Sequence, residues 1–269
     1  MRQDQRGPFV AALEQARAAA YPRGEYVGQE GFMGAGEIRH LACRARIGPG
    51  TSVLDLCCGV AGPGRLIVAE RRCRYLGLDL STSAVEIAGE MAGVLPCRFE
   101  HAHVPPLPDG RFEVVLLFET MLAFRDKGAL FSEVARVLVP GGRFACTVEE
   151  GRPLSLKERA EMPDADTVWL IGLSDMMVLL EAVGLTVTWQ QQCTASHQAM
   201  ASALLQSFRT HSVEIARQIG TQALDELILA HQLWSDWFSS GRVRKFAVVA
   251  QKRSPVSMPA HHVRTLLLG

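Results

Sequence analysis

The sequence lacks a surplus of charge of either sign, because 28 lysines and arginines balance 28 aspartates and glutamates. It also has no run rich in lysine and arginine. Proteins that bind nucleic acid through its phosphates usually present a basic face. We therefore expect no nucleic-acid partner.

Long apolar runs are missing as well. No stretch reaches the roughly 20 residues that a membrane span needs, and the first ten residues lack the apolar segment of a secretory signal. The seven cysteines are an odd number, and their spacing matches no metal-binding pattern. We expect a cytoplasmic protein with reduced thiols, no membrane segment and no bound metal.

Internal repeats and low-complexity tracts are also absent, and the 269 residues suffice for one sizeable α/β domain with a cap. Short β-rich segments alternate with helical ones. This alternation predicts an α/β fold with a seven-stranded, mostly parallel sheet and helices on both faces. Ligands of such sheets bind outside the carboxyl ends of the strands. The strands are expected at 52–56, 75–80, 97–102, 112–118, 143–148, 185–189 and 245–251.

The segments outside the sheet predict further units. A glycine-rich aromatic stretch at 21–36 is typical of a lid. Two amphipathic helices, at about 198–219 and 222–238, indicate a cap whose apolar stripes we expect to pack against the sheet. The predicted division is N-terminal helices and lid at 1–50, core at 51–189, cap at 190–243, last core strand at 244–253 and flexible tail at 254–269.

A glycine-rich turn follows the first predicted strand and opens a helix, in the segment VLDLCCGVAGPG at 53–64. Its glycines, Gly59 and Gly62 among them, let a ligand approach the backbone closely. Asp55 lies before the glycines, where an acid suits a ligand with an amino group better than a pyrophosphate. A tight turn without a ligand is the alternative.

Asp79 ends the second predicted strand, 24 residues after Asp55. A carboxylate in this place can accept hydrogen bonds from both hydroxyls of a ribose. Asp79 and the following Leu80 are therefore candidate cofactor-binding residues. The alternative for Asp79 is a simple helix cap.

Four segments in order, VLDLCCGVAGPG, YLGLDLS, LPDGRFEVVLLFE and VLVPGGRF, resemble the successive motifs of class I methyltransferases over about residues 50–148. The resemblance implies a Rossmann-like fold, S-adenosyl-L-methionine as the cofactor and S-adenosyl-L-homocysteine as the product. The family usually has glycine where Cys57 stands and often where Ala61 stands. After the third strand, His103 stands where the family often places an acid on the adenine; it is either an adenine contact or an exposed loop histidine.

A weaker resemblance links the chain to phosphoethanolamine and sarcosine/dimethylglycine methyltransferases. It rests on the Gly-Glu-Tyr loop at 24–26, the long helical insertion and the Arg-Lys-Phe segment at 244–246. Those enzymes methylate small molecules in a pocket closed by an N-terminal lid. The lid residues Tyr26 and Gln29 are therefore expected to contact the cofactor.

The acceptor side offers two candidate catalytic residues. Glu119 follows the fourth strand, where the family lines the cleft between cofactor and substrate, so it is a candidate for both cofactor binding and catalysis. His197 begins the cap and can act as a general base, although a lone histidine is also an ordinary wall residue. Glu149 and Glu150 follow the fifth strand, and we expect at least one of them to face solvent. His231 lies on an apolar helix face and is expected to be a core histidine.

These observations favour methyl transfer from S-adenosyl-L-methionine to a small-molecule acceptor through a nitrogen, oxygen or carbon nucleophile. The chain is expected to act as a monomer or homodimer. The alternative is a protein of the same fold that binds the cofactor and catalyses another reaction or serves as a binding module. A nicotinamide oxidoreductase would need G-x-G-x-x-G directly after the strand, and an RNA methyltransferase is disfavoured by the neutral charge.

Overall fold

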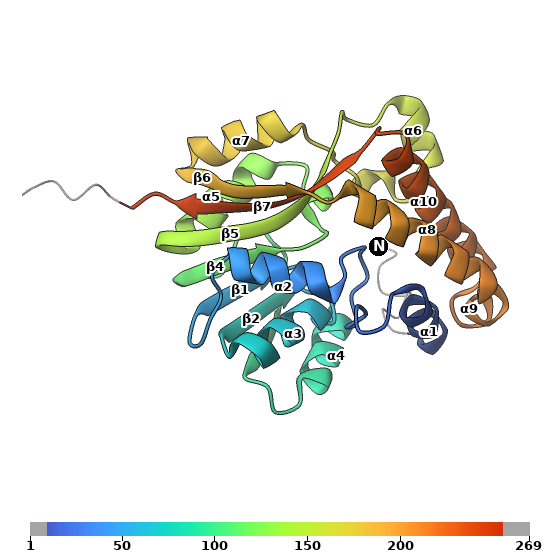
Figure 1. Cartoon of the computed structure of the whole chain (residues 1–269), viewed down its shortest axis with the longest axis horizontal. Coiled ribbons are helices and arrows are strands. Elements are labelled where there is room, and N and C mark those ends of the chain that lie inside the picture. The colour runs from blue at the N-terminus through green and yellow to red at the C-terminus, as the bar shows by residue number, and fades with distance from the viewer. Residues whose placement is uncertain (1–9, 255–269) are drawn as a thin grey trace, which may run out of the picture.

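The computed structural model describes residues 10–254, which form a central seven-stranded sheet (Figure 1). The strand order is β3-β2-β1-β4-β5-β7-β6. All neighbouring strands are parallel except β7, which runs antiparallel to both β5 and β6. The predicted mostly parallel sheet is thus confirmed. The strands are β1 (Ser52–Leu56), β2 (Arg74–Asp79), β3 (Cys97–His101), β4 (Phe112–Leu117), β5 (Leu138–Glu150), β6 (Leu185–Gln192) and β7 (Arg244–Lys252).

Helices cover both faces of the sheet, as predicted. Helices α2 (Ala35–Arg44) and α3 (Gly62–Arg71) pack on one face, and α5 (Lys127–Val137) and α7 (Leu173–Ala182) on the other (Figure 1). The central strand β4 shows why its sequence is almost continuously apolar. Val114 and Leu116 belong to the core on the α2–α3 side, and Val115 and Leu117 to the core on the α5–α7 side. A strand buried on both faces has no solvent-facing positions to make polar.

Local capping explains where two of the sheet-covering helices begin. The Ser81 hydroxyl accepts a hydrogen bond from the Ala84 amide at the start of α4 (Thr82–Ala92), and Asp126 does the same for Ala129 in α5. Such caps satisfy amides that have no partner within the helix.

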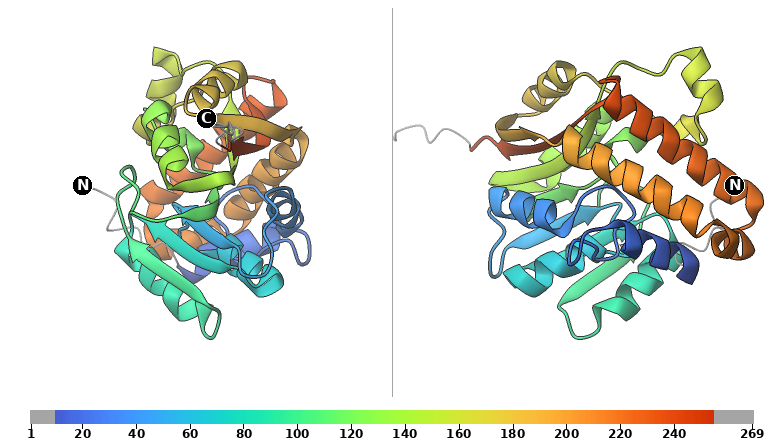
Figure 2. Two further views of the ribbon diagram at one scale, coloured as in Figure 1. Left: turned by 90° about the vertical axis from the view of Figure 1, so that its left-hand side faces the viewer. Right: turned by 45° about the vertical axis from the view of Figure 1, so that its right-hand side comes forward.

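The insertion between β6 and β7 forms three helices, α8 (Thr194–Thr210), α9 (Ser212–Ile219) and α10 (Thr221–Ser239). The prediction of one continuous helix at 198–219 is wrong, because the chain breaks at His211. The residues around the break are Thr, His and Ser, which have modest helix propensity. The break lets α9 turn back toward the N-terminal part of the chain (Figure 2).

The apolar stripes of the cap do not pack mainly on the sheet, so that expectation is also wrong. Leu204 and Phe208 of α8 share a core with Ala12 and Ala16 of the N-terminal helix α1 (Ala11–Ala20). The Ser207 hydroxyl donates to the Ala16 carbonyl at 2.7 Å. Figure 2 shows α1 beside α8, at the end of the molecule where the cap lies. The N-terminal helix therefore supplies the apolar surface that the cap needs.

Three further local features were not predicted. The fifth strand, expected at 143–148, already begins at Leu138; within its added part Gly141 takes a positive φ of 77°, and the register with β4 shifts. A short helix α6 (Leu156–Glu161) follows β5. Two 3₁₀ turns, Met121–Ala123 and Ala165–Thr167, complete the elements.

Two findings bear on the expectations about the environment of the chain. None of the helices within residues 10–254 is long and apolar enough to cross a membrane. All seven cysteines are free. The predicted flexible tail lies outside the described residues except for Ser254.

Candidate functional site

The glycine-rich turn after β1 is bound to the end of β2 through Asp79. The carboxylate of Asp79 accepts hydrogen bonds from the Gly59 amide at 2.7 Å and from the Ser81 amide at 2.9 Å. Gly59 has a positive φ of 55°, which glycine adopts at little cost. The carboxylate therefore lies beside the backbone of the turn, at the carboxyl ends of two adjacent parallel strands.

Cys57 and Ala61 also have a φ of 56°, in the left-handed region that disfavours side chains. These are the two positions at which the resemblance to class I methyltransferases predicts glycine. The turn thus has the left-handed backbone conformation that glycine favours, although these two residues are not glycines.

Asp55 lies deeper than the turn and is 4% exposed. Its carboxylate accepts a hydrogen bond from the Tyr75 hydroxyl at 2.5 Å. Burial raises the pKa of Asp55 to about 7, and the nearby charge of Asp79 adds to this rise, against a lowering by the Tyr75 hydrogen bond. Asp55 thus has a structural partner within the core, and contact with the amino group of a ligand remains a proposal.

The raised pKa of Asp55 predicts a dependence of stability on pH. A carboxyl whose pKa is higher in the folded chain than in the unfolded chain stabilises the fold below pH 4 and loses that contribution as the pH rises toward 7. The Asp55→Asn variant keeps an acceptor for Tyr75 but cannot ionise. The free energy of unfolding of the wild type, relative to that of the variant, should fall by roughly 1.4 kcal/mol per pH unit between about pH 5 and 7. Urea denaturation at four pH values measures this, and parallel curves for the two proteins would exclude a raised pKa.

The segment 26–33 lies over the glycine-rich turn and is held by its own hydrogen bonds. The Gln29 side chain is buried; its amide nitrogen donates to the carbonyls of Glu25 and Met33, and its oxygen accepts from the Val27 amide. A side chain at Gly62 would overlap the backbone of Val27 and Gly28. Glycine is therefore required at Gly62 by the segment above it.

Tyr26 and Phe32 connect the same segment to other parts of the molecule. The Tyr26 hydroxyl donates to Glu14 of α1 at 2.6 Å. The Phe32 ring packs edge-on against His197, His231 and Phe238 of the cap. The glycine-rich segment thus lies between the sheet, the N-terminal helix and the cap.

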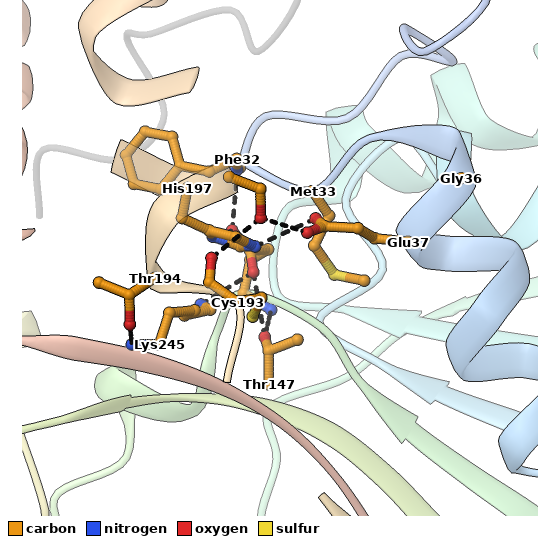
Figure 3. A network of polar contacts seen from close by, with 12 residues as sticks. Phe32, Met33, Gly36, Glu37, Thr147, Cys193, Thr194, His197 and Lys245 are labelled. Carbon is orange, nitrogen blue, oxygen red and sulfur yellow. Dashed lines mark hydrogen bonds and ion pairs between the residues drawn. The ribbon is translucent and has the colours of Figure 1, made fainter. Parts of the chain in front are cut away.

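Figure 3 shows a buried polar network that includes Phe32, Thr147 and Lys245. Glu119, which follows β4, contacts all three of these residues. One carboxylate oxygen accepts from the Phe32 amide at 2.8 Å, and the other accepts from the Thr147 hydroxyl at 3.1 Å and from the Lys245 ammonium at 2.8 Å. A side chain at Gly31 would overlap Glu119. The lid segment, β5 and β7 therefore converge on this one carboxylate.

Lys245 is fully buried and pairs with two carboxylates, those of Glu119 and Glu149. Burial alone would lower the pKa of the ammonium, but the charges and hydrogen bonds of the two carboxylates raise it above its usual range. Burial alone would raise the pKa of Glu119, but the charges of Lys245 and then His197 hold it well below its usual range. Glu119 and Lys245 therefore form a buried ion pair in the folded chain.

His197 is 0% exposed and lies between two carboxylates. Its Nε2 is 3.2 Å from Oε2 of Glu37, and its Nδ1 is 3.8 Å from Oε2 of Glu119. Neither ring nitrogen makes a hydrogen bond of acceptable geometry. A cavity of about 160 Å³ adjoins the ring and is lined by Glu37, His197, Cys193, Thr147, Met33 and Trp189, together with residues of α2, β6 and β7.

The structure brings together several predicted site residues but not all of them. Asp79 contacts Gly59, the lid segment covers Gly62, and Glu119 faces His197. Leu80 is 49% exposed and His103 is exposed, so any contact of these two with a cofactor remains a proposal.

The strand register determines where the side chains of Glu149 and Glu150 lie, and burial in α10 determines the role of His231. Glu149 points inward to Lys245, and Glu150 pairs with Arg244 at the surface-facing position, as expected for neighbours in a strand. His231 behaves as the predicted core histidine, because burial lowers its pKa to about 4 and its Nδ1 lies 2.8 Å from the Leu227 carbonyl.

Sequence reasoning missed Lys245, Glu37, Cys193 and Thr147 as members of the network. The signal available for Lys245 was its place directly before the apolar run 246–250, since a lysine that the sheet buries needs a charged partner. Glu37, at the start of α2, gave no comparable signal.

The comparisons with known proteins agree with this geometry. Residues 54–146 match the family model described as a methyltransferase domain. Phosphoethanolamine N-methyltransferase 1 of Arabidopsis thaliana is 33% identical over 137 residues, which cover 48% of this chain and 28% of that protein. Residues 54–146 therefore match a methyltransferase domain, in agreement with the motifs read from the sequence.

Solved structures share the fold of most of the chain. A putative sarcosine dimethylglycine methyltransferase from Galdieria sulphuraria aligns with a TM-score of 0.73 at 18% identity, covering 82% of this chain and 85% of that one. The [4+2]-cyclase SpnF aligns with the same TM-score at 17% identity, covering 92% and 94%. The chain spans less than a third of the length of the curated relatives it matches first.

Proposed function

We propose that this methyltransferase transfers the methyl group of S-adenosyl-L-methionine to a small-molecule acceptor. The observation that carries the proposal is the contact of Asp79 with the Gly59 amide in the matched domain. A carboxylate beside a glycine-rich turn, at the carboxyl ends of two parallel strands, fits the hydroxyls of a ribose and leaves the backbone open to the rest of a nucleoside. Gly59, Gly62 and Asp79 would hold the cofactor, with Asp55, Leu80, His103, Tyr26, Gln29 and Glu119 as further candidates.

The cofactor, when bound, supplies an electrophilic methyl group on a sulfonium. The residues of the chain align the acceptor and exclude water from the reacting atoms. Glu119 is the candidate for orienting the acceptor or balancing a positive charge, because its carboxylate is buried and ionised beside the lid. His197, on the cap side of Glu119, is the candidate proton acceptor; this role requires that one ring nitrogen be free of its carboxylate neighbour.

The lid segment and the cap support an acceptor of limited size. Phe32 is inserted among the cap side chains, and the Phe32 amide is bound to Glu119. An acceptor near Glu119 is thus enclosed by the sheet on one side and by the lid and cap on the other. Such enclosure suits small organic molecules rather than long polymers.

A screen for the acceptor tests the proposal. The full chain is incubated with S-adenosyl-L-methionine and a panel of amines, phenols and indoles, and release of S-adenosyl-L-homocysteine is followed. We expect release that depends on at least one small acceptor. Methylation of long RNA alone would contradict an enclosed small-molecule site.

A closing lid predicts a change in hydrogen exchange. Backbone amides across 21–36 should exchange more slowly when S-adenosyl-L-homocysteine binds, because this segment already contacts Gly62 and Glu119 and would be held over the ligand. Amides of α9, on the far side of the cap, provide the internal control. Unchanged protection across 21–36 with a saturating ligand would show that the segment is a surface loop and not a lid.

A second candidate function is a reaction other than methyl transfer on the same bound cofactor, or a role as a binding module. The fold-level likeness to a [4+2]-cyclase favours keeping it. The screen separates the two candidates: tight binding of S-adenosyl-L-methionine, with acceptor turnover but without release of S-adenosyl-L-homocysteine, would support this second one.

A further inference from the structure

Three side chains of metal-binding type meet in the cavity beside the sheet (Figure 3). Glu37 comes from α2, Cys193 directly precedes α8, and His197 lies in the first turn of α8. One ligand atom from each lies within 4.8 Å of the other two. The three residues are brought together from two distant parts of the chain, so their spacing in the sequence matches no metal-binding pattern.

The imidazole of His197 lacks a satisfactory partner. The ring is 0% exposed, and both of its nitrogens are buried without a hydrogen bond of acceptable geometry. Buried polar atoms of this kind are rare, and each one calls for an explanation. Nε2 points toward Glu37, at the side where Cys193 also lines the cavity.

We infer that Glu37, Cys193 and His197 bind a zinc ion. In a tetrahedral zinc site, bonds of about 2.0–2.2 Å place a nitrogen and an oxygen ligand about 3.4 Å apart, and a sulfur and a nitrogen about 3.6 Å apart. Nε2 of His197 and Oε2 of Glu37 are 3.2 Å apart. Because the ligand atoms of the three residues lie within 4.8 Å of one another, the thiol of Cys193 has to approach by at most about 1.2 Å to reach the spacing of a zinc site.

The surrounding groups are arranged as supports for the three ligands. The Ser196 hydroxyl donates to Oε1 of Glu37 at 2.5 Å, which leaves Oε2 for a metal. Nδ1 of His197 faces Glu119, and a histidine that binds zinc through one nitrogen commonly donates its other N–H to a carboxylate. Two carboxylates, those of Glu119 and Glu149, pair with the ammonium of Lys245, and a third, that of Glu37, lies beside His197 without a lysine or arginine partner among the ion pairs of the described residues. This excess of negative charge favours a divalent cation.

The fourth coordination position opens into the cavity of about 160 Å³. Zinc with three protein ligands and one open position is the arrangement of catalytic rather than structural sites. When the ion binds, the thiol of Cys193 loses its proton to the solvent and its sulfur forms the bond to zinc. The site goes beyond the proposed methyl transfer and differs from the expectation, based on cysteine spacing, that no metal binds. While zinc is bound, Nε2 of His197 is coordinated and its Nδ1–H is donated to Glu119, so His197 can accept a proton from an acceptor only in the zinc-free chain.

Metal binding by the full chain tests the inference. The protein is stripped with a chelator, dialysed and titrated with zinc in the presence of a chromophoric competitor; a parallel sample receives cobalt. The variants are Cys193→Ser and Glu37→Gln, with Ser196→Ala for the support of Glu37. The controls are Cys43→Ser, an exposed cysteine on the same helix as Glu37, and His40→Gln, which lines the same cavity. Thermal melts establish that each variant folds.

We expect one equivalent of zinc in the wild type and in both controls. Affinity should fall at least tenfold in Cys193→Ser and Glu37→Gln, and by about 10-fold or more in Ser196→Ala. Cobalt should give a thiolate-to-metal absorption band that disappears only in Cys193→Ser. Equal zinc affinity in the wild type and folded Cys193→Ser, a cobalt band that survives in that variant, or equal loss in Cys43→Ser would each overturn the inference.

Discussion

Replacing Lys245 by methionine should destabilise the fold by about 3–5 kcal/mol, the range for breaking a buried ion pair on one side. Methionine keeps most of the volume of the side chain but leaves Glu119 and Glu149 buried without their shared cation. Oε2 of Glu149 already has no hydrogen-bond partner, so it has no alternative contact to fall back on. Since domains are stable by only about 5–15 kcal/mol, the substitution would remove a large part of the free energy of unfolding. Urea denaturation at neutral pH gives the difference.

Two further variants separate this effect from a general sensitivity of β7. Arg244 is the neighbouring residue and pairs with Glu150 across the same two strands, but at the surface. Arg244→Met should change the denaturation midpoint little, because exposed ion pairs contribute little. Adding Glu119→Gln and Glu149→Gln to Lys245→Met should restore much of the lost stability, since no buried charge is then left unpaired. A Lys245→Met protein as stable as the wild type would show that the network is not ionised.

Glu119→Gln should reduce turnover of the methyl acceptor at least tenfold, and roughly 10²–10³-fold if the full electrostatic contribution of the carboxylate is lost. Glutamine keeps the shape and the hydrogen bond from Phe32 but removes the charge. His197→Ala is expected to reduce turnover in the same direction, by tenfold or more. The affinity for S-adenosyl-L-homocysteine should stay nearly unchanged in both variants. Release of S-adenosyl-L-homocysteine at saturating acceptor measures the first quantity and calorimetry the second.

Because Glu119 also binds Lys245, each variant is compared with the wild type only at temperatures where its thermal melt shows it folded. Glu150→Gln is the matched control. Glu150 also lies at this end of the sheet, but its carboxylate pairs with Arg244 at the surface. Full turnover in both Glu119→Gln and His197→Ala would place the acceptor elsewhere. A loss of turnover that followed a loss of cofactor affinity would instead make Glu119 a cofactor-binding residue.

The sheet and the cofactor side of the site could be predicted because their signals are local. The apolar run of β4, the glycines after β1 and the acid at the end of β2 lie within short segments, and parallel strands bring their carboxyl ends to one edge. Cys57 and Ala61 have the left-handed backbone conformation that the resemblance predicts for glycines at these positions. The order of such segments along the chain was therefore sufficient to place Asp79 beside Gly59.

The acceptor side depends on contacts between distant segments, and the sequence predicted less of it. Glu37 and His197 are 160 residues apart in the numbering but 3.2 Å apart through their side chains. The partner of the cap was missed for the same reason: an amphipathic stripe indicates that a face is buried, but not which surface covers it. Here α1 covers the stripe. Lys245 became meaningful only once the register placed it opposite Glu149.

Calorimetric titration with S-adenosyl-L-homocysteine, on the wild type and on Asp79→Ala, tests the central claim most directly. Asp79 is the carboxylate assigned to the ribose, and loss of a charged hydrogen-bonding group costs about 1.5–3 kcal/mol of binding free energy, which corresponds to roughly 10–150-fold in affinity. We predict saturable one-site binding to the wild type and this loss in Asp79→Ala, with no loss in Asp109→Ala, an exposed acid remote from the turn. Equal affinity in the wild type and Asp79→Ala, or tight saturable binding of NAD in place of S-adenosyl-L-homocysteine, would contradict the account.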